Sequence, residues 1–134
     1  MTLEAYTRAM MVRFAVQEAQ RYGGANNMLA VLHVLRNRVM AGWGDWQEVV
    51  ESAELRRGTI YPPWKNNMRS NDVRVLLNRV EEIYTRVDTT DLVGGALFYI
   101  DQNFPVEEWF AKEIMGHPDD HKRVAHVGPV WFFT

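Results

Sequence analysis

The sequence predicts an α+β fold, a mainly helical domain with a small antiparallel β-sheet. Two observations lead to this prediction: apolar residues recur at helical spacing between residues 3 and 87, and two short runs of aromatic and β-branched residues follow Gly94-Gly95. The chain has 134 residues, 47% of them hydrophobic, and contains no repeat or low-complexity tract. We therefore expect one domain over residues 1–134 with a single hydrophobic core.

Three helices are expected in the first part of the chain. Residues 3–21 contain no Pro or Gly and have apolar residues on two faces, as in a buried central helix. Gly23-Gly24 ends this helix, and a second one with an apolar stripe is expected over residues 26–42, which makes a helical hairpin. Asp45 and Glu48 have the spacing of an N-cap and its polar partner, so a short third helix is expected to start there.

The rest of the chain is predicted to contain a loop, two more helices and two strands. Residues 56–70 include adjacent prolines and adjacent asparagines and are expected to form a long surface loop, of the kind that often binds ligands. Helical spacing predicts a fourth helix over residues 71–87. Residues 96–100 and 127–133 are the two expected strands, and residues 106–115 are expected to form a short helix between them.

Composition excludes several classes of function. The formal net charge is -2, so no net positive field is available for a nucleic-acid backbone, and a DNA or RNA partner is not expected. The absence of cysteine excludes disulfides, Cys-ligated metals and a thiol nucleophile. No signal peptide and no apolar run of about 18 residues is found, so membrane insertion is not expected and the localisation stays open.

Glu18 is a carboxylate on an otherwise apolar arc of the first predicted helix. It falls between Met11 and Phe14 on the helical wheel, one turn before Tyr22. Apolar surroundings raise the pKa of a carboxyl group, which can then serve as a general acid near neutral pH, as glycosidic bond cleavage requires. The alternative is a glutamate at a helix end that reaches solvent or pairs with Arg21.

Five segments, in order, carry a resemblance to a known family. They are Val16-Gln17-Glu18-Ala19, the twelve residues from Met28 to Val39, Gly95-Ala96-Leu97-Phe98-Tyr99, Trp109, and Val127-Gly128 leading to Phe132-Phe133. Each segment alone is common, but their order and separations are more specific. Over nearly its whole length the chain resembles the SleB-type cell-wall hydrolases, the spore-cortex-lytic enzymes.

The resemblance implies a lysozyme-like fold that cleaves the glycan strands of bacterial peptidoglycan. It places the catalytic glutamate of the family at Glu18 and implies a lytic transglycosylase without a cofactor. In that reaction Glu18 protonates the oxygen of the bond between N-acetylmuramic acid and N-acetylglucosamine. The carboxylate then takes the proton of the sugar's own 6-hydroxyl group, which gives a 1,6-anhydro product.

Four further residues are candidates for substrate binding. Asn37 shares a face of the second helix with His33 and is expected to point across the hairpin towards Glu18; the alternative is a surface amide. Tyr99 is expected either at the cleft or in the core. Tyr61 and Trp64, in the proline-rich loop, can stack on sugar rings.

Other positions are expected to have structural roles or to depart from the family pattern. Arg38 is expected to be solvated or ion-paired, and Trp109 and Trp131 are expected in the core. Val130 stands where the family would have a histidine, and the nearest one is His126. The lack of peptidoglycan-binding repeats and of a signal favours a minimal, phage-encoded or domain-only form of the family.

Three alternatives stay open. A group of potential metal ligands in one predicted loop could make the protein a metal-dependent hydrolase, although no metal-binding motif is present: His117, Asp119, Asp120, His121 and His126. Asp45, Asp91 or Asp101 could act as a second acid in ordinary hydrolysis, although solvated loop or cap positions are expected for them. The third alternative is a non-catalytic module, for example a phage structural component, that binds glycan.

Overall fold

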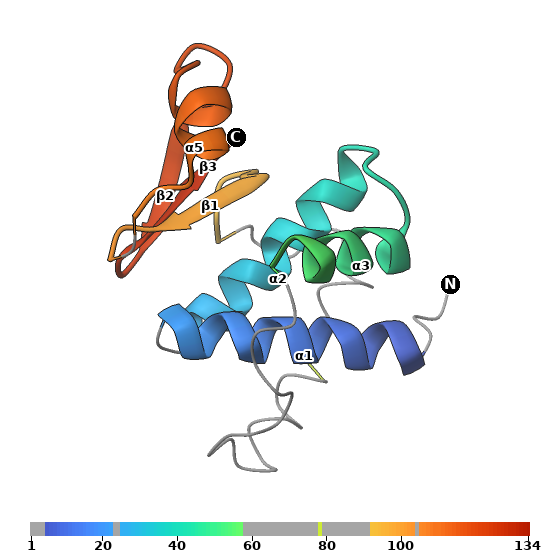
Figure 1. The fold of residues 1–134 in the computed structure, drawn as a ribbon. Helices are drawn as coiled ribbons and strands as arrows, with labels where there is room; N and C mark the ends of the chain where they lie inside the picture. Colours follow the sequence, from blue (N-terminus) through green and yellow to red (C-terminus); the bar gives the residue numbers. More distant parts are fainter. Residues whose placement is uncertain (1–4, 23–24, 58–77, 79–91, 104) are drawn as a thin grey trace.

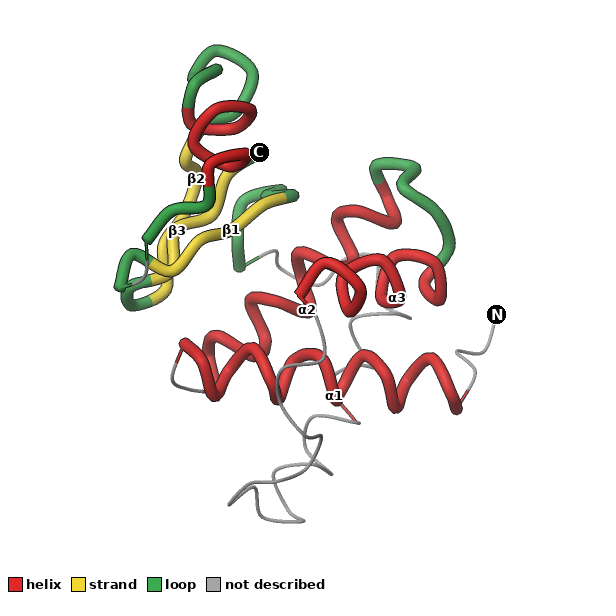
Figure 2. The backbone as a smooth tube through the Cα atoms, viewed as in Figure 1, coloured by secondary structure: helices red, strands yellow, loops and turns green. Residues whose placement is uncertain are grey.

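The computed structural model describes residues 5–22, 25–57, 78, 92–103 and 105–134 and has the predicted α+β fold. Three helices form one group and a three-stranded sheet with a short helix forms the other (Figures 1 and 2). The helices are α1 (Ala5–Tyr22), α2 (Ala25–Met40) and α3 (Trp46–Arg57), followed by α5 (Glu108–Phe110), which continues as a π-helical turn, η1 (Ala111–Met115). The strands are β1 (Phe98–Asp101), β2 (Arg123–Val127) and β3 (Val130–Phe133).

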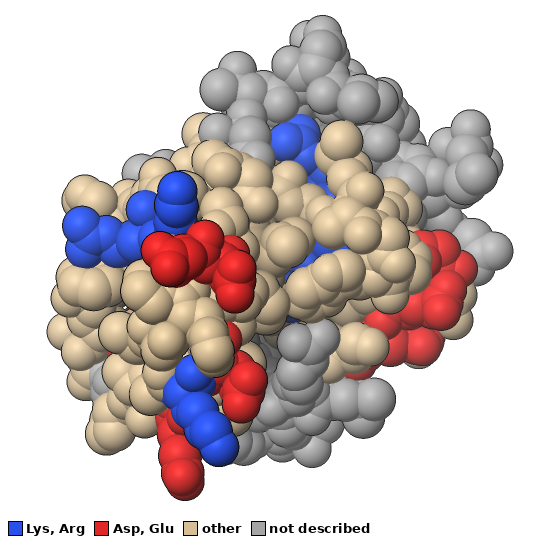
Figure 3. All heavy atoms as spheres, turned by 90° about the horizontal axis from the view of Figure 1, so that it is seen from above, with Lys and Arg blue, Asp and Glu red and all other residues tan. Residues whose placement is uncertain are grey.

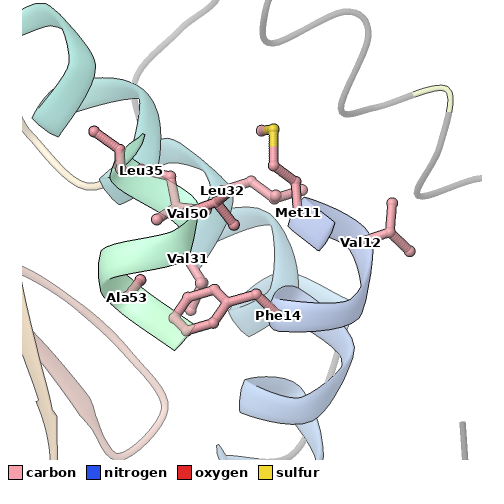
Figure 4. Close-up of a cluster of buried hydrophobic side chains, with 9 residues drawn as sticks. Met11, Val12, Phe14, Val31, Leu32, Leu35, Val50 and Ala53 are labelled. Carbon is pink, nitrogen blue, oxygen red and sulfur yellow. The ribbon is translucent and has the colours of Figure 1, made fainter. Parts of the chain in front are cut away.

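The helical group is held together by apolar side chains from all three helices. Met11 and Phe14 of α1 pack with Leu32 and Leu35 of α2 and with Val50 of α3, and all five are almost fully buried (Figure 4). Each fully buried side chain of this size contributes roughly 1.5–3 kcal/mol relative to an exposed one. The spacing of these residues is the helical spacing on which the prediction of a hairpin rested.

The longest run of buried residues in the described part of the chain lies in α2. Every residue from Ala30 to Arg38 is buried, whereas Tyr6 in α1 is 58% exposed. The reason is that the sheet covers the face of α2 that does not contact α1 and α3, with Ala30 and Val34 packed beside Val130 and Phe132. Helix α1, which was predicted to be the central buried helix, packs on both α2 and α3, and its described residues include both buried and exposed ones.

The start of α3 follows the predicted capping pattern. The backbone N–H of Glu48 donates to Asp45 Oδ1 at 2.8 Å, and the backbone N–H of Asp45 donates to Glu48 Oε1 at 3.3 Å. These two bonds satisfy donors that the first turn of a helix leaves without partners. The helix continues to Arg57, two residues into the segment that was expected to be a loop.

The sheet is antiparallel with the order β1-β3-β2, and both of its faces are covered. On the central strand, Val130 and Phe132 face α2, while Phe133, with the partly buried Trp131, packs against Phe110 of α5 and the following turn. This alternation is the period of two expected for a strand.

Strand β2 was not predicted, and the strand expected over residues 127–133 begins only at Val130. The structure divides this segment at Gly128 and Pro129, and Val127 pairs with Val130 across the resulting hairpin. Gly128 has a φ of 57°, and proline fixes a negative φ at the next position, the sign pattern of a type II′ turn. The sequence Val-Gly-Pro-Val was thus a hairpin signal inside an apolar run.

The remaining predicted elements fall partly outside the described residues. Of the fourth helix, over residues 71–87, only Asn78 is described, and it is helical. The first strand, predicted over residues 96–100, begins two residues later and ends one residue later, at Phe98–Asp101. The helix predicted over residues 106–115 is confirmed in a shorter form. In the described part of the chain, no helix has both the length and the apolarity needed to cross a bilayer.

Candidate active site

Glu18 lies in α1, one turn before its end at Tyr22. Its backbone is helical, as predicted, and its side chain lies outside the described part of the structure. Helix α1, which contains this candidate catalytic residue, packs against both α2 and α3. Its role as general acid stays a prediction.

Asn37 is buried and joins α2 to the chain leading into the sheet. The side chain is 8% exposed, and Nδ2 donates to the backbone oxygen of Ala96 at 3.1 Å. The end of α1 and the start of α2 adjoin in the sequence. Measured along the helix axes at 1.5 Å per residue, Asn37 lies about 18 Å from the start of α2, whereas Glu18 lies only about 6 Å from the end of α1. The two residues are thus at different levels of the hairpin, and the alternative of a surface amide is wrong.

Arg38 makes the second connection between the same two segments. Its Nε donates to the backbone oxygen of Leu97 at 2.9 Å, and its guanidinium carbon lies 5.0 Å from the centre of the Trp43 ring. The residue is only 7% exposed, so the expectation of a solvated arginine is wrong. Burial is tolerated because the guanidinium group has both a carbonyl oxygen and an aromatic face as partners.

A row of rings continues from Arg38 across the sheet. Trp43 lies 5.5 Å from Phe98, and Phe98 lies 5.4 Å from the His121 ring in an edge-to-face arrangement. His121 ends the row with a contact of 2.7 Å between Nδ1 and the backbone oxygen of Thr134. Residues from α2, the turn after it, β1 and the segment before β2 are thereby brought together.

The other candidates for substrate binding have different outcomes. Tyr99 is half-buried, packs against both the helical and the sheet clusters, and lies 6.0 Å from the Phe132 ring, which agrees with the alternative of a core tyrosine. Tyr61 and Trp64 lie outside the described residues, so their roles as stacking platforms stay predictions. Trp109 was expected in the core but is 45% exposed, and Trp131 is half-buried.

The three aspartates considered as second acids also differ. Asp45 is the cap of α3, as expected, and Asp91 lies outside the described part of the chain. Asp101, for which a solvated loop or cap position was expected, is only 7% exposed at the end of β1. Its Oδ1 accepts a hydrogen bond of 2.9 Å from the backbone N–H of Asn103, and its buried Oδ2 has no hydrogen-bond partner in the described structure.

The histidines do not all lie in one loop. His126 lies on β2 rather than in a loop, opposite Trp131, while His117 and His121 precede that strand. Within the part of the chain that the structure describes, no group of three His, Asp or Glu residues is arranged to hold a metal ion. Val130, at the position where the family would have a histidine, is buried in the core between α2 and the sheet.

Sequence analysis missed the long-range roles of Arg38 and Trp43. The only signal in the sequence was that Trp43 follows shortly after Arg38, close to the end of an amphipathic helix. The chain matches no protein-family model, no curated protein and no solved structure. The resemblance to the SleB-type hydrolases therefore stays a prediction.

Proposed function

We propose that the protein is a peptidoglycan-degrading glycosidase that acts as a lytic transglycosylase, with Glu18 as its single general acid and base. The observation that carries the proposal is that three of the five segments of the family resemblance meet in space. Asn37 and Arg38 of the second segment bind the backbone of Ala96 and Leu97 in the third. Phe98 and Tyr99 of the third pair with the last segment, Phe133 and Phe132.

These hydrogen bonds join segments that are far apart in the sequence. Fifty-nine residues separate the two members of each hydrogen-bonded pair. The two hydrogen bonds and the strand pairs thus bring these three segments into one connected unit. The unit is built on α2, which packs directly on the helix that carries Glu18.

The proposed chemistry uses one carboxyl group twice. The protonated carboxyl of Glu18 gives its proton to the glycosidic oxygen as the bond to the anomeric carbon breaks. The resulting carboxylate then accepts the proton of the 6-hydroxyl group, whose oxygen bonds to the anomeric carbon. Glu18 is thereby returned to its protonated form and no water is consumed, in contrast to hydrolysis with a second carboxylate.

Two of the three candidate second acids, Asp45 and Asp101, are described, and each has a structural role. Asp45 and Asp101 each use a side-chain oxygen to accept a backbone N–H, at the start of α3 and after β1 respectively. A carboxylate that caps a turn in this way has a structural role without any substrate. Ordinary hydrolysis needs a second carboxylate that activates water or attacks the sugar. Asp45 is occupied at the start of α3, whereas Asp101 keeps one buried oxygen without a hydrogen-bond partner in the described structure.

The test compares Glu18→Gln with the wild type on purified peptidoglycan, followed by mass analysis of the released muropeptides. Glu113→Gln is a matched control, because Glu113 is an exposed glutamate of η1. We expect anhydro muropeptides from the wild type and from the control. For Glu18→Gln we expect a rate lower by about 10²–10⁴-fold, the usual contribution of general acid catalysis.

Other outcomes would assign a different function. Products with reducing ends would indicate hydrolysis and make Asp101 the first residue to test as the second acid. Binding to the wall without release of fragments by the wild type would indicate the non-catalytic glycan-binding module. Loss of activity on metal removal would indicate the metal-dependent hydrolase.

A further inference from the structure

A second candidate site lies on the sheet, away from the helices α1 and α2. It is an open pocket of about 380 Å³ at the end of the sheet where β2 begins and β3 ends. Its lining combines apolar and cationic side chains: Met115, Pro118, His121, Lys122, Arg123, Trp131 and Phe133. None of these residues belongs to the helix that carries Glu18, and none is acidic.

Arg123 is fixed in this pocket by stacking. Its guanidinium carbon lies 4.3 Å from the centre of the Trp131 ring. Within the described structure the guanidinium group makes no hydrogen bond and no ion pair, so its N–H donors are available to a ligand. An arginine held in place on an aromatic ring loses less conformational entropy when it binds a carboxylate in the bidentate geometry.

A β-bulge explains why Arg123 points into the pocket. Arg123 pairs with Phe133 and Ala125 pairs with Phe132, so Val124 is an extra residue without a partner on β3. Without this extra residue, the alternation along β2 would direct Arg123 to the face that packs against α2. The bulge moves Arg123 to the face of Trp131 and Phe133, and bulges commonly redirect side chains in this way next to binding sites.

The two residues before Arg123 are also held in place. His121 Nδ1 lies 2.7 Å from the backbone oxygen of Thr134, which can only accept, so Nδ1 carries the proton and Nε2 is left for another partner. The backbone of Lys122 makes two hydrogen bonds with Thr134. The Lys122 N–H donates to the Thr134 hydroxyl oxygen at 3.0 Å, and the Thr134 N–H donates to the Lys122 backbone oxygen at 2.9 Å. Three consecutive polar side chains thus project from an ordered backbone.

We propose that this pocket binds a carboxylate attached to a small apolar group, as at the carboxyl end of a short peptide. Arg123, with Lys122 beside it, receives the carboxylate, and the side chains of Met115 and Phe133 receive the apolar group. Given the proposed function, on which this assignment of the ligand rests, the ligand is the D-alanyl end of a peptidoglycan stem peptide. The protein would then hold the wall at a point separate from the bond that it cleaves.

The test is a titration with N-acetyl-D-alanyl-D-alanine, in which binding is monitored through the NMR signal of the Trp131 indole N–H. The matched ligand is its C-terminal amide, which has the same shape and lacks the charge. We expect saturable shifts with the acid and none with the amide. Arg123→Gln should weaken binding by about ten- to a hundredfold, since hydrogen bonds to charged groups are the strong ones.

Two further variants test whether binding depends on the planar guanidinium group of Arg123 or only on positive charge. Arg123→Lys keeps the charge without the planar fork and should give an intermediate loss. Lys112→Gln removes a positive charge from an exposed position on η1 that does not line the pocket, and should leave binding unchanged. Both Arg123 and Lys112 are exposed, so the fold should be retained, which the backbone amide spectrum checks directly.

Each result has a defined meaning. Equal binding of acid and amide, or equal losses in Arg123→Gln and Lys112→Gln, would overturn the carboxylate site. Equal binding of N-acetyl-L-alanyl-L-alanine would retain the carboxylate site and overturn its assignment to wall stem peptides. Failure of the proposed function would be distinguishable, because cleavage is read from the muropeptides released from peptidoglycan, whereas peptide binding is read from the Trp131 signal and does not require cleavage.

Discussion

Replacement of Asn37 by alanine tests whether the connection between α2 and the sheet is structural. The substitution removes the donor to the Ala96 oxygen, and Ala96 is itself fully buried. A buried carbonyl group left without its partner costs about 1–3 kcal/mol. Alanine is a better helix former than asparagine by up to about 0.7 kcal/mol, which offsets part of this loss. We expect the free energy of unfolding to fall by about 1–2 kcal/mol.

Urea denaturation followed by tryptophan fluorescence measures this change, with a lower midpoint and an unchanged slope. Asn78→Ala is the control, because Asn78 is helical and exposed. Hydrogen exchange gives a local readout at the Leu97 N–H, which donates to the Phe133 oxygen at 2.9 Å. Exchange at this amide should accelerate more than exchange in the middle of α2, because the sheet should detach before the helices unfold.

The reasoning would be refuted if Asn37→Ala and Asn78→Ala were equally stable and the Leu97 amide exchanged at its wild-type rate. Asn37→Asp provides an independent check. It keeps the size of the side chain but places an acceptor opposite the Ala96 carbonyl oxygen. It should therefore be at least as destabilising as the alanine variant.

Two further predictions concern the capping box and the hairpin turn. Asp45→Ala removes the acceptor for the Glu48 N–H and should lower the free energy of unfolding, measured by urea denaturation, by about 1 kcal/mol. The control, Ser52→Ala, lies at an exposed position of the same helix and should change this free energy by less than about 0.5 kcal/mol. Gly128→Ala meets no atom within 4 Å, so only the positive φ of 57° opposes it, and thermal unfolding should report a loss of about 1–2 kcal/mol; an unchanged transition would show that the turn does not need this conformation.

The elements that sequence analysis predicted correctly depend on neighbouring residues. The capping box of α3 involves positions three residues apart, and the apolar stripe of α2 repeats within one or two turns. Such signals are complete within a short window. The location of Glu18 within a helix was predictable for the same reason.

The elements that were missed depend on contacts between distant segments. Arg38 was expected to be solvated or ion-paired, because no residue near it in the sequence indicates its hydrogen bond to the Leu97 carbonyl oxygen or the sheet that covers α2. The strand β2 was missed because residues 123–127 have a bulge, which breaks the alternation by which a half-buried strand is recognised. The pocket beside Arg123 depends on the same bulge and was not predictable from periodicity.

The connection between α2 and β1 places unequal demands on its two sides. Asn37 and Arg38 contribute side chains, whereas Ala96 and Leu97 contribute only backbone oxygens. Every amino acid supplies a backbone oxygen, so the hydrogen bonds themselves impose no residue type at positions 96 and 97. Mutational tolerance should therefore be asymmetric: at position 97, which is half-buried, many side chains should preserve the junction, while at positions 37 and 38 few should do so.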